Sequence, residues 1–246
     1  MQILFFDTLD STNNYCKLLD PSKVGEFTVI WAGNQTAGIG QQGNVWVSEP
    51  YKNLTLSLIL KPTFLALTDQ WLLSMTLALA VTDTIENILS KSKIQNPFFI
   101  KWPNDIYIDD NKVCGILITN RVSNNHISQS ICGIGLNVNQ TIFPDWVPNP
   151  TSLSLETGKN HELKPLLELL LYNLESRYLQ LKKNPDSIKP DYMSRLYRLG
   201  KPSPYIYNGN QITAIISDVD RLGHLHLLTD NHEEITCDLK EIKFVI

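Results

Sequence analysis

Residues 98–119 read FFIKWPNDIYIDDNKVCGILIT, three short apolar runs with two interruptions. Pro103 makes the first interruption, and the polar run Asp109–Asn111 makes the second. Short apolar runs bounded by Pro, Asp and Asn are typical of strands joined by tight turns. The stretch therefore predicts consecutive strands and a hairpin, which brings Lys101 and Lys112 near one another. Two such cations can hold phosphate oxygens or a carboxylate.

The sequence on both sides of this hairpin predicts further strands and helices. Apolar residues that recur every three to four positions favour helices, and short apolar or alternating runs favour strands. Strands are expected at 3–7, 27–31, 54–58 and 127–138, and helices at 69–89, 163–181 and 191–199. A short helix is expected to begin near residue 12, with Ser11 or Asp10 as its N-cap. The pattern indicates an α+β fold with a mixed, mostly antiparallel sheet and flanking helices.

Residues 200–246 have a different pattern from the rest of the chain. They hold short alternating strands, with turn signals at Asn208-Gly209, Leu222-Gly223 and Asp230-Asn231. Closely spaced turns of this kind are typical of a small antiparallel barrel. We therefore expect one large domain at 1–199 and a small β-barrel at 200–246.

The composition argues against several classes of protein. The 246 residues include 21 Lys plus Arg against 25 Asp plus Glu, and the basic residues are scattered, which argues against nucleic acid as the main partner. The most apolar window, 71–81, is shorter than the ~20 residues that a bilayer requires, and the N-terminus lacks a signal-peptide pattern. The four cysteines are widely spaced, which predicts reduced thiols in a cytoplasmic protein.

A glycine-rich loop follows the strand expected at 27–31. Residues 38–43, Gly-Ile-Gly-Gln-Gln-Gly, match the G-x-G-x-x-G pattern of dinucleotide-binding loops. The context argues against that use, because the next segment is extended and no helix opens at the third glycine. Such a loop can still close over a ligand as a lid, since its backbone amides approach anionic oxygens freely. A mobile connection without a ligand is the alternative.

Several motifs taken together resemble the biotin protein ligase family, in that family's order and spacing. They are Asp10-Ser11-Thr12-Asn13, the loop from Gln35 to Trp46, Lys101-Trp102-Pro103-Asn104-Asp105, Lys112-Val113-Cys114-Gly115 and Gly133-Ile134-Gly135-Leu136-Asn137-Val138-Asn139. The Lys-Trp-Pro-Asn-Asp run is highly specific, and the resemblance covers essentially the whole chain. It implies the class II synthetase-like biotin/lipoate ligase fold with an SH3-like C-terminal barrel. It also implies the ligase-only class, without an N-terminal DNA-binding domain.

The resemblance implies an ATP-dependent reaction in two steps. The biotin carboxylate attacks the α-phosphorus of ATP and releases pyrophosphate, which leaves biotinyl-5'-AMP. A specific lysine of a biotin carboxyl carrier protein domain then displaces AMP. Both steps develop negative charge on phosphate oxygens, which calls for fixed cations and Mg²⁺ rather than a protein nucleophile.

The resemblance also implies three groups of site residues. Those expected to bind biotin are Ser11, Thr12, Asn13, Gln35, Ile39, Gly40, Gln41, Lys112 and Gly115. Those expected to bind the nucleotide are Gly38, Gly43, Trp46, Asn104, Asn137 and Trp146, although a core role is the alternative for either tryptophan. Those expected to act in catalysis are Lys112 on the biotin carboxylate and adenylate phosphate, Lys101 on phosphate charge, and Asp105 on the incoming lysine. The metal ligands are unknown.

The glycine loop departs from the family pattern. The family loop usually reads G-R-G-x-x-G with further arginines, whereas Ile39, Gln41, Gln42 and Asn44 leave this loop without positive charge. A lost charged hydrogen bond to phosphate costs ~1.5 to 3 kcal/mol. We therefore expect weaker retention of the adenylate than in an arginine-bearing relative.

Three other functions remain open at this point. A lipoate or octanoate ligase or transferase shares the fold and the acyl chemistry, although Gln35 and the Ser11-Thr12-Asn13 run favour biotin. A non-catalytic biotin-binding protein is suggested by the arginine-free loop. A metal site at His224 and His226 would need a third ligand that the nearby sequence lacks. The chain is expected to be a monomer or a weak homodimer.

Overall fold

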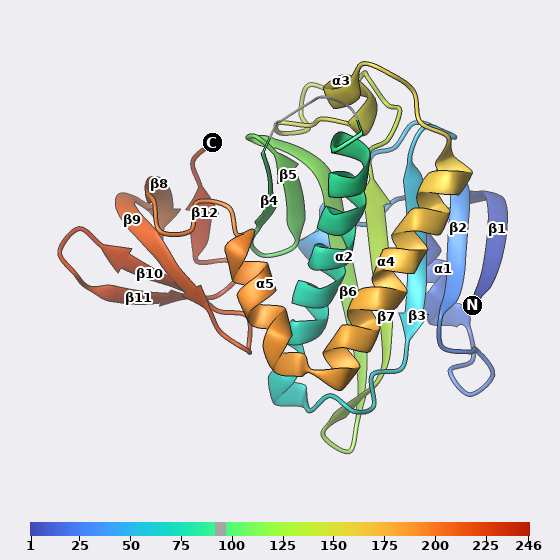
Figure 1. The fold of residues 1–246 in the computed structure, drawn as a ribbon, viewed down its shortest axis with the longest axis horizontal. Coiled ribbons are helices and arrows are strands. Elements are labelled where there is room, and N and C mark those ends of the chain that lie inside the picture. Colours follow the sequence, from blue (N-terminus) through green and yellow to red (C-terminus); the bar gives the residue numbers. More distant parts are fainter. Residues whose placement is uncertain (92–96) are drawn as a thin grey trace.

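The structure is a computed structural model that describes residues 1–91 and 97–246 (Figure 1). A seven-stranded sheet forms its centre, in the order β1-β2-β3-β7-β6-β5-β4. The strands are β1 (Gln2–Leu9), β2 (Thr28–Gln35), β3 (Leu54–Leu60), β4 (Phe98–Lys101), β5 (Asp105–Ile108), β6 (Asn111–Ser123) and β7 (His126–Leu136). Only β1 and β2 of this sheet pair in parallel, so the expected mixed, mostly antiparallel sheet is confirmed.

The strand register sets the geometry of the 98–119 stretch. Lys101 lies opposite Asp105, Asp105 lies opposite Gly115, and Gly115 lies opposite Gly135. The expected hairpin turns at Asp109 and Asp110, and Asp109 has a φ of 50°. Four strands therefore bring residues far apart in sequence into one row across the sheet.

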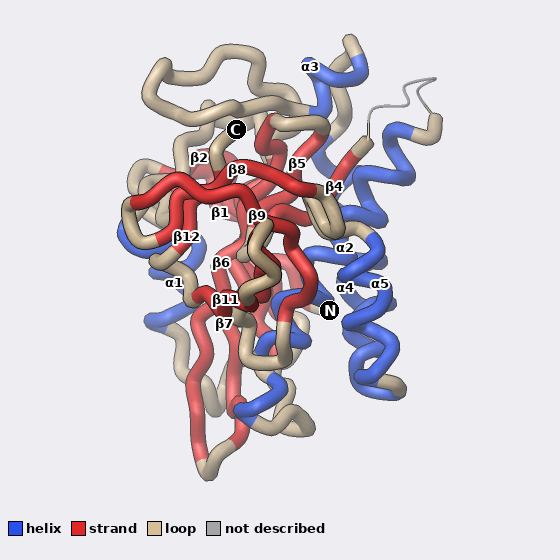
Figure 2. Tube along the Cα trace, turned by 90° about the vertical axis from the view of Figure 1, so that its left-hand side faces the viewer, coloured by secondary structure: helices blue, strands red, loops and turns tan. Residues whose placement is uncertain are grey.

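Longer helices cover one face of the sheet, and a short helix lies on the other (Figure 2). The helices are α1 (Thr12–Leu18), α2 (Trp71–Leu89), α3 (Leu153–Thr157), α4 (Leu163–Lys183) and α5 (Ile188–Ser194), with short 3-10 turns at Gln41–Gly43, Leu67–Asp69 and Pro185–Ser187. The central helix, α2, buries most of its length against the sheet and α4. The expectation that no apolar segment is long enough for a membrane is wrong on length, because Leu67–Leu89 passes that test. Its most apolar 18-residue window is 72% buried inside the protein, as the core helix of a globular domain is.

Helix α1 lies on the opposite face from α2 and α4. Ser11 is its N-cap and accepts a hydrogen bond from the backbone amide of Asn14 at 3.5 Å. Cys16 then packs against Ile30, Ile59 and Ile131, which come from three strands. The cap and this small apolar cluster hold residues 11–13 over the sheet.

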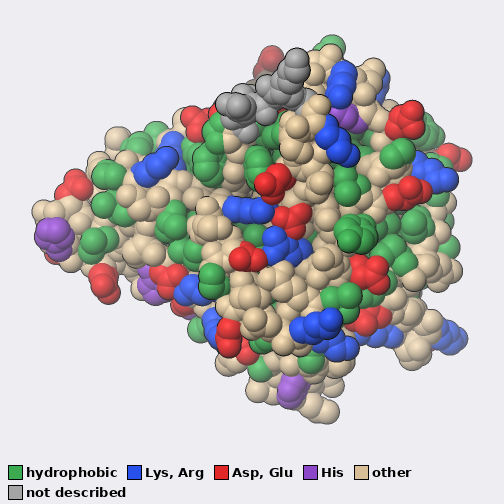
Figure 3. Space-filling view, in the orientation of Figure 1, with side chains coloured by type: hydrophobic (Ala, Val, Ile, Leu, Met, Phe, Trp, Pro, Cys, Tyr) green, Lys and Arg blue, Asp and Glu red, His purple; other side chains and the backbone are tan. Residues whose placement is uncertain are grey.

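Ion pairs join the helices on the covered face. Arg177 of α4 contacts Asp83 of α2 and Asp191 of α5, each at 2.6 Å. Arg195 reaches Asp83 at 2.7 Å and Glu86 at 3.1 Å. Positive and negative side chains are interspersed on this face (Figure 3). The last helix was expected at 191–199, but α5 runs from Ile188 to Ser194. It begins early because Pro185 starts a 3-10 turn that leads directly into it, and it ends early because Leu196 pairs with Ile100 of β4.

The C-terminal segment forms a separate five-stranded antiparallel sheet in the order β11-β10-β9-β8-β12. Its strands are β8 (Pro202–Tyr207), β9 (Asn210–Val219), β10 (Leu225–Thr229), β11 (Glu234–Cys237) and β12 (Ile242–Phe244). The three expected turns all fall between strands, and Asn208, Gly209 and Gly223 have positive φ values. This sheet lies beside β4 and β5 (Figure 1).

Candidate functional site

Three glycines form a depression on the α1 side of the central sheet. Gly115 of β6 lies opposite Gly135 of β7, and Gly133 lies two residues before Gly135 on the same face. A Cβ at Gly133 would lie 2.1 Å from Nδ2 of Asn13, and a Cβ at Gly135 would lie 2.3 Å from the Trp46 ring. The missing side chains therefore let α1 and the glycine loop lie directly against the sheet.

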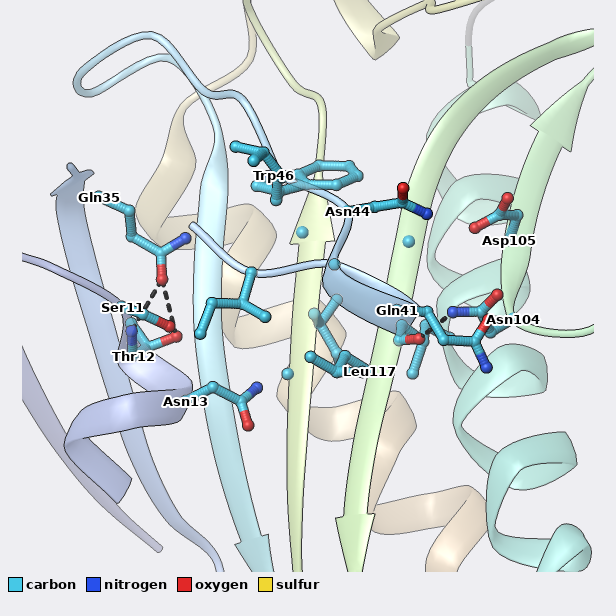
Figure 4. Close-up of a pocket in the computed structure, with 18 of the residues that line it drawn as sticks. Ser11, Thr12, Asn13, Gln35, Gln41, Asn44, Trp46, Asn104, Asp105 and Leu117 are labelled. Carbon is cyan, nitrogen blue, oxygen red and sulfur yellow. Dashed lines mark hydrogen bonds between the residues drawn. The ribbon is translucent and has the colours of Figure 1, made fainter. Parts of the chain in front are cut away.

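One end of this depression is polar. The Gln35 side-chain oxygen accepts hydrogen bonds from the backbone amide of Thr12 at 2.8 Å and from its hydroxyl at 3.1 Å (Figure 4). The Thr12 hydroxyl also lies 2.8 Å from that of Ser57. Oδ1 of Asn13 is buried without a hydrogen-bond partner in the protein. We call Ser11, Thr12, Asn13 and Gln35 the polar pole, and it offers both donors and acceptors to a ligand.

The glycine loop folds back on itself above the depression. Gly40 donates its amide to the Asn44 carbonyl at 2.7 Å, and Trp46 donates its amide to the Gly38 carbonyl at 3.0 Å. A Cβ at Gly38 would lie 2.4 Å from the Trp46 carbonyl oxygen, which explains the glycine there. The Trp46 ring lies over the sheet in Figure 4, with its Nε1 buried and unpartnered. The loop thus lies over the depression, in the position that a lid over a ligand would take.

The other end of the depression carries charge. Nζ of Lys112 lies 2.6 Å from Oδ1 of Asp105, and the two side chains are 28% and 15% exposed. Asn104 donates Nδ2 to the Ile116 carbonyl at 2.5 Å, and its own carbonyl accepts from the Ile116 amide at 2.9 Å. Since an ammonium group has three donors, Lys112 can donate hydrogen bonds to a ligand beside its ion pair with Asp105.

Lys101 lies near this end, but its ammonium group points among aromatic rings. Nζ of Lys101 is 4.4 Å from the centre of the Phe244 ring and 5.3 Å from that of Tyr107. Burial lowers the pKa of Lys101, and the nearby Asp105 carboxylate opposes that shift. Lys101 lies opposite Asp105 in the sheet, whereas Lys112 contacts the Asp105 carboxylate directly. The charge of Lys112 also lowers the pKa of Lys101, so the two ammonium groups lie within electrostatic reach of one another.

Two cavities meet at Trp46 and Lys112. The first, of about 200 Å³, runs from the polar pole to Asp105. The second, of about 270 Å³, is lined largely by apolar groups, among them Phe143, Trp146 and Pro150. Trp46 and Lys112 line both cavities. A ligand in each cavity would therefore meet its neighbour beside one lysine.

The structure gathers most of the expected site residues around these cavities. The first cavity is lined by Ser11, Thr12, Asn13, Gln35, Ile39, Gly40, Gln41, Asn104, Asp105 and Gly115. The second is lined by Asn137 and Trp146, and both by Trp46 and Lys112. The residues expected here that line neither cavity are Gly38, Gly43 and Lys101. Asn104 lies in the first cavity, although the sequence places it with the nucleotide, because its side chain is tied to β6.

Several lining residues were missed by the sequence analysis. In the first cavity these include Asn44, Leu56, Leu117, Gly133 and Gly135. Two glycines separated by one residue on a strand, facing a third glycine on its neighbour, are a usable signal for a close backbone approach. Phe143, Val147, Pro148 and Pro150 lie in an irregular segment, which carries no periodic signal.

Other chemistry is limited in the described parts of the chain. Burial raises the pKa of Cys114, next to Gly115, which disfavours the thiolate that a nucleophile requires. His224 and His226 both face Asp220, at 2.8 Å and 3.4 Å from its Oδ2. Within residues 1–91 and 97–246, no group of three His, Cys, Asp or Glu side chains is placed to hold a metal ion. The two histidines thus share a carboxylate as a local hydrogen-bond group.

The fold and the site define an α+β domain with two adjoining cavities that share Trp46 and Lys112 in their lining. The family model described as "Biotin/lipoate A/B protein ligase family" matches residues 5–137, which is more than half of the chain. The chain belongs to the biotin/lipoate A/B protein ligase family.

Several known proteins are similar to this chain in sequence or in fold. The "Bifunctional ligase/repressor BirA" of Bacillus subtilis is 36% identical over 180 residues, which cover 72% of this chain and 53% of that protein. The "Biotin--[acetyl-CoA-carboxylase] ligase" of Mycobacterium tuberculosis is 29% identical, over 81% of this chain and 72% of its own. A solved biotin protein ligase from Aquifex aeolicus, in complex with biotin and ATP, superimposes with a TM-score of 0.81 at 27% identity and covers 99% of both chains. The chain thus spans about half the length of the BirA protein and nearly all of the Aquifex ligase.

Proposed function

We propose that this protein is an ATP-dependent ligase that forms biotinyl-5'-AMP and transfers biotin to a lysine of a biotin carboxyl carrier protein domain. The observation that carries the proposal is the course of the first cavity. It runs from the polar pole to Lys112, and Lys112 also lines the second cavity. A molecule with an amide-like ring at one end and a carboxylate at the other fits this cavity, with the ring at the polar pole and the carboxylate at Lys112. The names and bound ligands of the similar proteins point to the same substrates.

The polar pole selects the head of the substrate. Thr12, Gln35 and the unpartnered Oδ1 of Asn13 present fixed donors and acceptors to a ureido ring. A plain acyl chain would leave the buried Oδ1 of Asn13 without a partner, which costs binding free energy. This end of the cavity favours biotin over lipoate or octanoate.

Lys112 acts at the junction where the new bond forms. Its ammonium group would donate hydrogen bonds to the biotin carboxylate and then to the α-phosphate as pyrophosphate leaves. Asp105 fixes the position of that ammonium group at 2.6 Å. In the second step, Asp105 would accept or orient a proton of the incoming lysine amine while the bond to AMP breaks. Trp46 lines both cavities beside Lys112, so its ring would cover the place where the two ligands meet and help exclude water.

Mg²⁺ fits this site as a companion of the nucleotide. The ion usually keeps several waters and is held by substrate phosphates plus one or two carboxylates. Asp105 is the carboxylate that lines the first cavity, and the buried Oδ1 of Asn137 has no partner in the protein. These two side chains would hold the ion or its waters, and the ion would neutralise phosphate charge.

The remaining properties belong to the same proposal. We expect the chain to work in the cytoplasm, as a monomer or a weak homodimer, on a carrier domain and not on nucleic acid or a membrane. The near balance of 21 Lys plus Arg against 25 Asp plus Glu fits a protein partner better than a polyanion.

The proposal is tested by exchange of labelled pyrophosphate into ATP. Purified protein with ATP and Mg²⁺ should catalyse the exchange when biotin is added, and not when lipoate or octanoate is added. Exchange with lipoate or octanoate alone would favour the related ligases. Binding of biotin without any exchange would favour a non-catalytic biotin-binding protein, which the uncharged loop also suits.

A further inference from the structure

The turn between β9 and β10 reaches from the C-terminal sheet into the larger domain. The Gly223 carbonyl accepts a hydrogen bond from Nε1 of the buried Trp102 at 2.9 Å. Gly223 has a φ of 99°, and a Cβ there would lie 2.3 Å from the Trp71 ring. The turn therefore fits closely between two tryptophans of the larger domain, and only glycine allows that approach.

Asp220 organises this turn. Its Oδ1 accepts hydrogen bonds from the backbone amides of Leu222, Gly223 and His224, at 2.9, 2.8 and 2.9 Å. Its Oδ2 accepts from Nδ1 of His224 at 2.8 Å, and Nε2 of His226 lies 3.4 Å away. Burial raises the pKa of Asp220, but the hydrogen bonds outweigh it and hold the pKa at about 2. One ionised carboxylate thus fixes the backbone that presents the Gly223 carbonyl.

Trp102 links this carbonyl to the site. It directly precedes Pro103, Asn104 and Asp105, and all three line the first cavity. The chain is held on both sides of Pro103, because Trp102 donates to the Gly223 carbonyl and Asn104 makes two hydrogen bonds with β6. Loss of the Trp102 bond therefore removes one of the two anchors of this short segment. That segment ends at Asp105, the partner of Lys112.

We propose that Asp220 is a positioning residue for the reaction, acting through the Gly223 carbonyl and Trp102 on the Asp105–Lys112 pair. The inference rests on the proposed function. Its consequence is selective, because the polar pole belongs to α1 and β2 at the other end of the cavity. Loss of Asp220 should therefore slow the chemical step and leave biotin binding nearly unchanged.

The first test compares Asp220→Ala, Asp220→Asn and the control Asp218→Ala. Asp218 lies on β9, two residues before Asp220, and pairs with Lys189 of α5 at 2.7 Å. Its loss therefore also weakens the attachment of the sheet without touching the turn. We expect Asp220→Ala to lower kcat of pyrophosphate exchange by roughly tenfold, the scale of one lost hydrogen bond, with KM for biotin within twofold. Asp220→Asn, which keeps an acceptor oxygen for the backbone amides, should recover most of kcat. Activities are normalised to the folded fraction.

The second test is a double-mutant cycle with Trp102→Phe. This change keeps an aromatic ring, removes the hydrogen bond to Gly223 and leaves the Asp220 turn intact, so it also serves if Asp220→Ala does not fold. The double variant should lose little beyond either single variant, because both changes break one link. The indole N–H signal of Trp102 in an NMR spectrum should shift in Asp220→Ala and stay unchanged in Asp218→Ala.

The results separate the two claims. Three results would overturn the positioning role of Asp220. They are a wild-type kcat in folded Asp220→Ala, a rise in KM for biotin as large as the fall in kcat, and additive losses of kcat in the double-mutant cycle. Wild-type protein without any exchange would refute the proposed function instead.

Discussion

Replacing Gly135 by alanine tests the position of the Trp46 ring, which lines both cavities. The new Cβ would lie 2.3 Å from Cε2 and 2.6 Å from Cζ2 of Trp46, where ordinary contact begins at 3.4 Å. The backbone cannot yield easily, because Gly135 pairs with Thr55 on one side and Gly115 on the other. The indole must therefore move by at least 1.1 Å, the difference between those distances.

The displaced ring lines both cavities, so the effect should be large on activity and moderate on stability. A misplacement of about 1 Å in a positioned group can cost roughly a hundredfold in rate, and we expect a fall of that size in kcat/KM for ATP. Overpacking costs ~1–3 kcal/mol, and the free energy of unfolding should fall within that range. Pyrophosphate exchange at varied ATP and urea unfolding followed by circular dichroism measure the two effects.

Two controls isolate the clash from a general effect of alanine. At Gly25 a new Cβ would meet its nearest atom, Oγ1 of Thr28, at 3.7 Å, so Gly25→Ala should leave kcat/KM unchanged. In a Trp46→Ala background, Gly135→Ala should add less than a twofold loss, because the clashing ring is gone. Full activity of Gly135→Ala in the wild-type background would refute the assigned place of Trp46.

Three further predictions concern charge. Lys112→Ala should lower pyrophosphate exchange by about 10²–10³-fold, because it removes a group that stabilises developing charge. The control Lys23→Ala, at a side chain that is 85% exposed, should not lower it. Wild-type exchange in Lys112→Ala would remove Lys112 from its role. Ile39→Arg should lengthen the half-life of the bound adenylate by more than tenfold, because a charged hydrogen bond to phosphate contributes ~1.5 to 3 kcal/mol. If the wild-type protein already retains the adenylate as long as arginine-bearing relatives do, other groups supply the charge. The low pKa of Asp220, about 2 against an ordinary value near ~3.9, means that its ionised form stabilises the fold above about pH 4 and that this contribution is lost as the pH falls toward 2. The difference in unfolding free energy between wild type and Asp220→Asn should shrink over that interval, and a difference independent of pH would contradict this.

Local patterns in the sequence were enough to predict most of the fold. The breaks at Pro103 and Asp109–Asn111 separate strands as expected, and Ser11 caps α1. The parallel pairing of β1 with β2 and the order of the strands depend on contacts between distant residues, which periodicity does not record. The short helix α3 and the early start of α5 were missed because a single turn carries too few periodic positions.

Two kinds of signal predicted parts of the site. The hairpin predicted two neighbouring lysines, and the resemblance to the ligase family implied Gln35 and the Ser11-Thr12-Asn13 run. The structure places Gln35 against Thr12 and Lys112 against Asp105. The position of Lys101 was not predictable, because Lys101 and Phe244 lie far apart in the sequence and in different sheets, and the fold brings them into contact. The link from Trp102 to Gly223 was missed for the same reason.

A crystal structure of the protein with biotin, Mg²⁺ and a non-hydrolysable ATP analogue would show whether the two substrates meet at Lys112. The proposal predicts the ureido ring against Gln35 and Thr12, the adenine in the second cavity, and both the biotin carboxylate and the α-phosphate within hydrogen-bond distance of Nζ of Lys112. Biotin bound outside the first cavity, or a Lys112 side chain that turns away from both ligands, would contradict it.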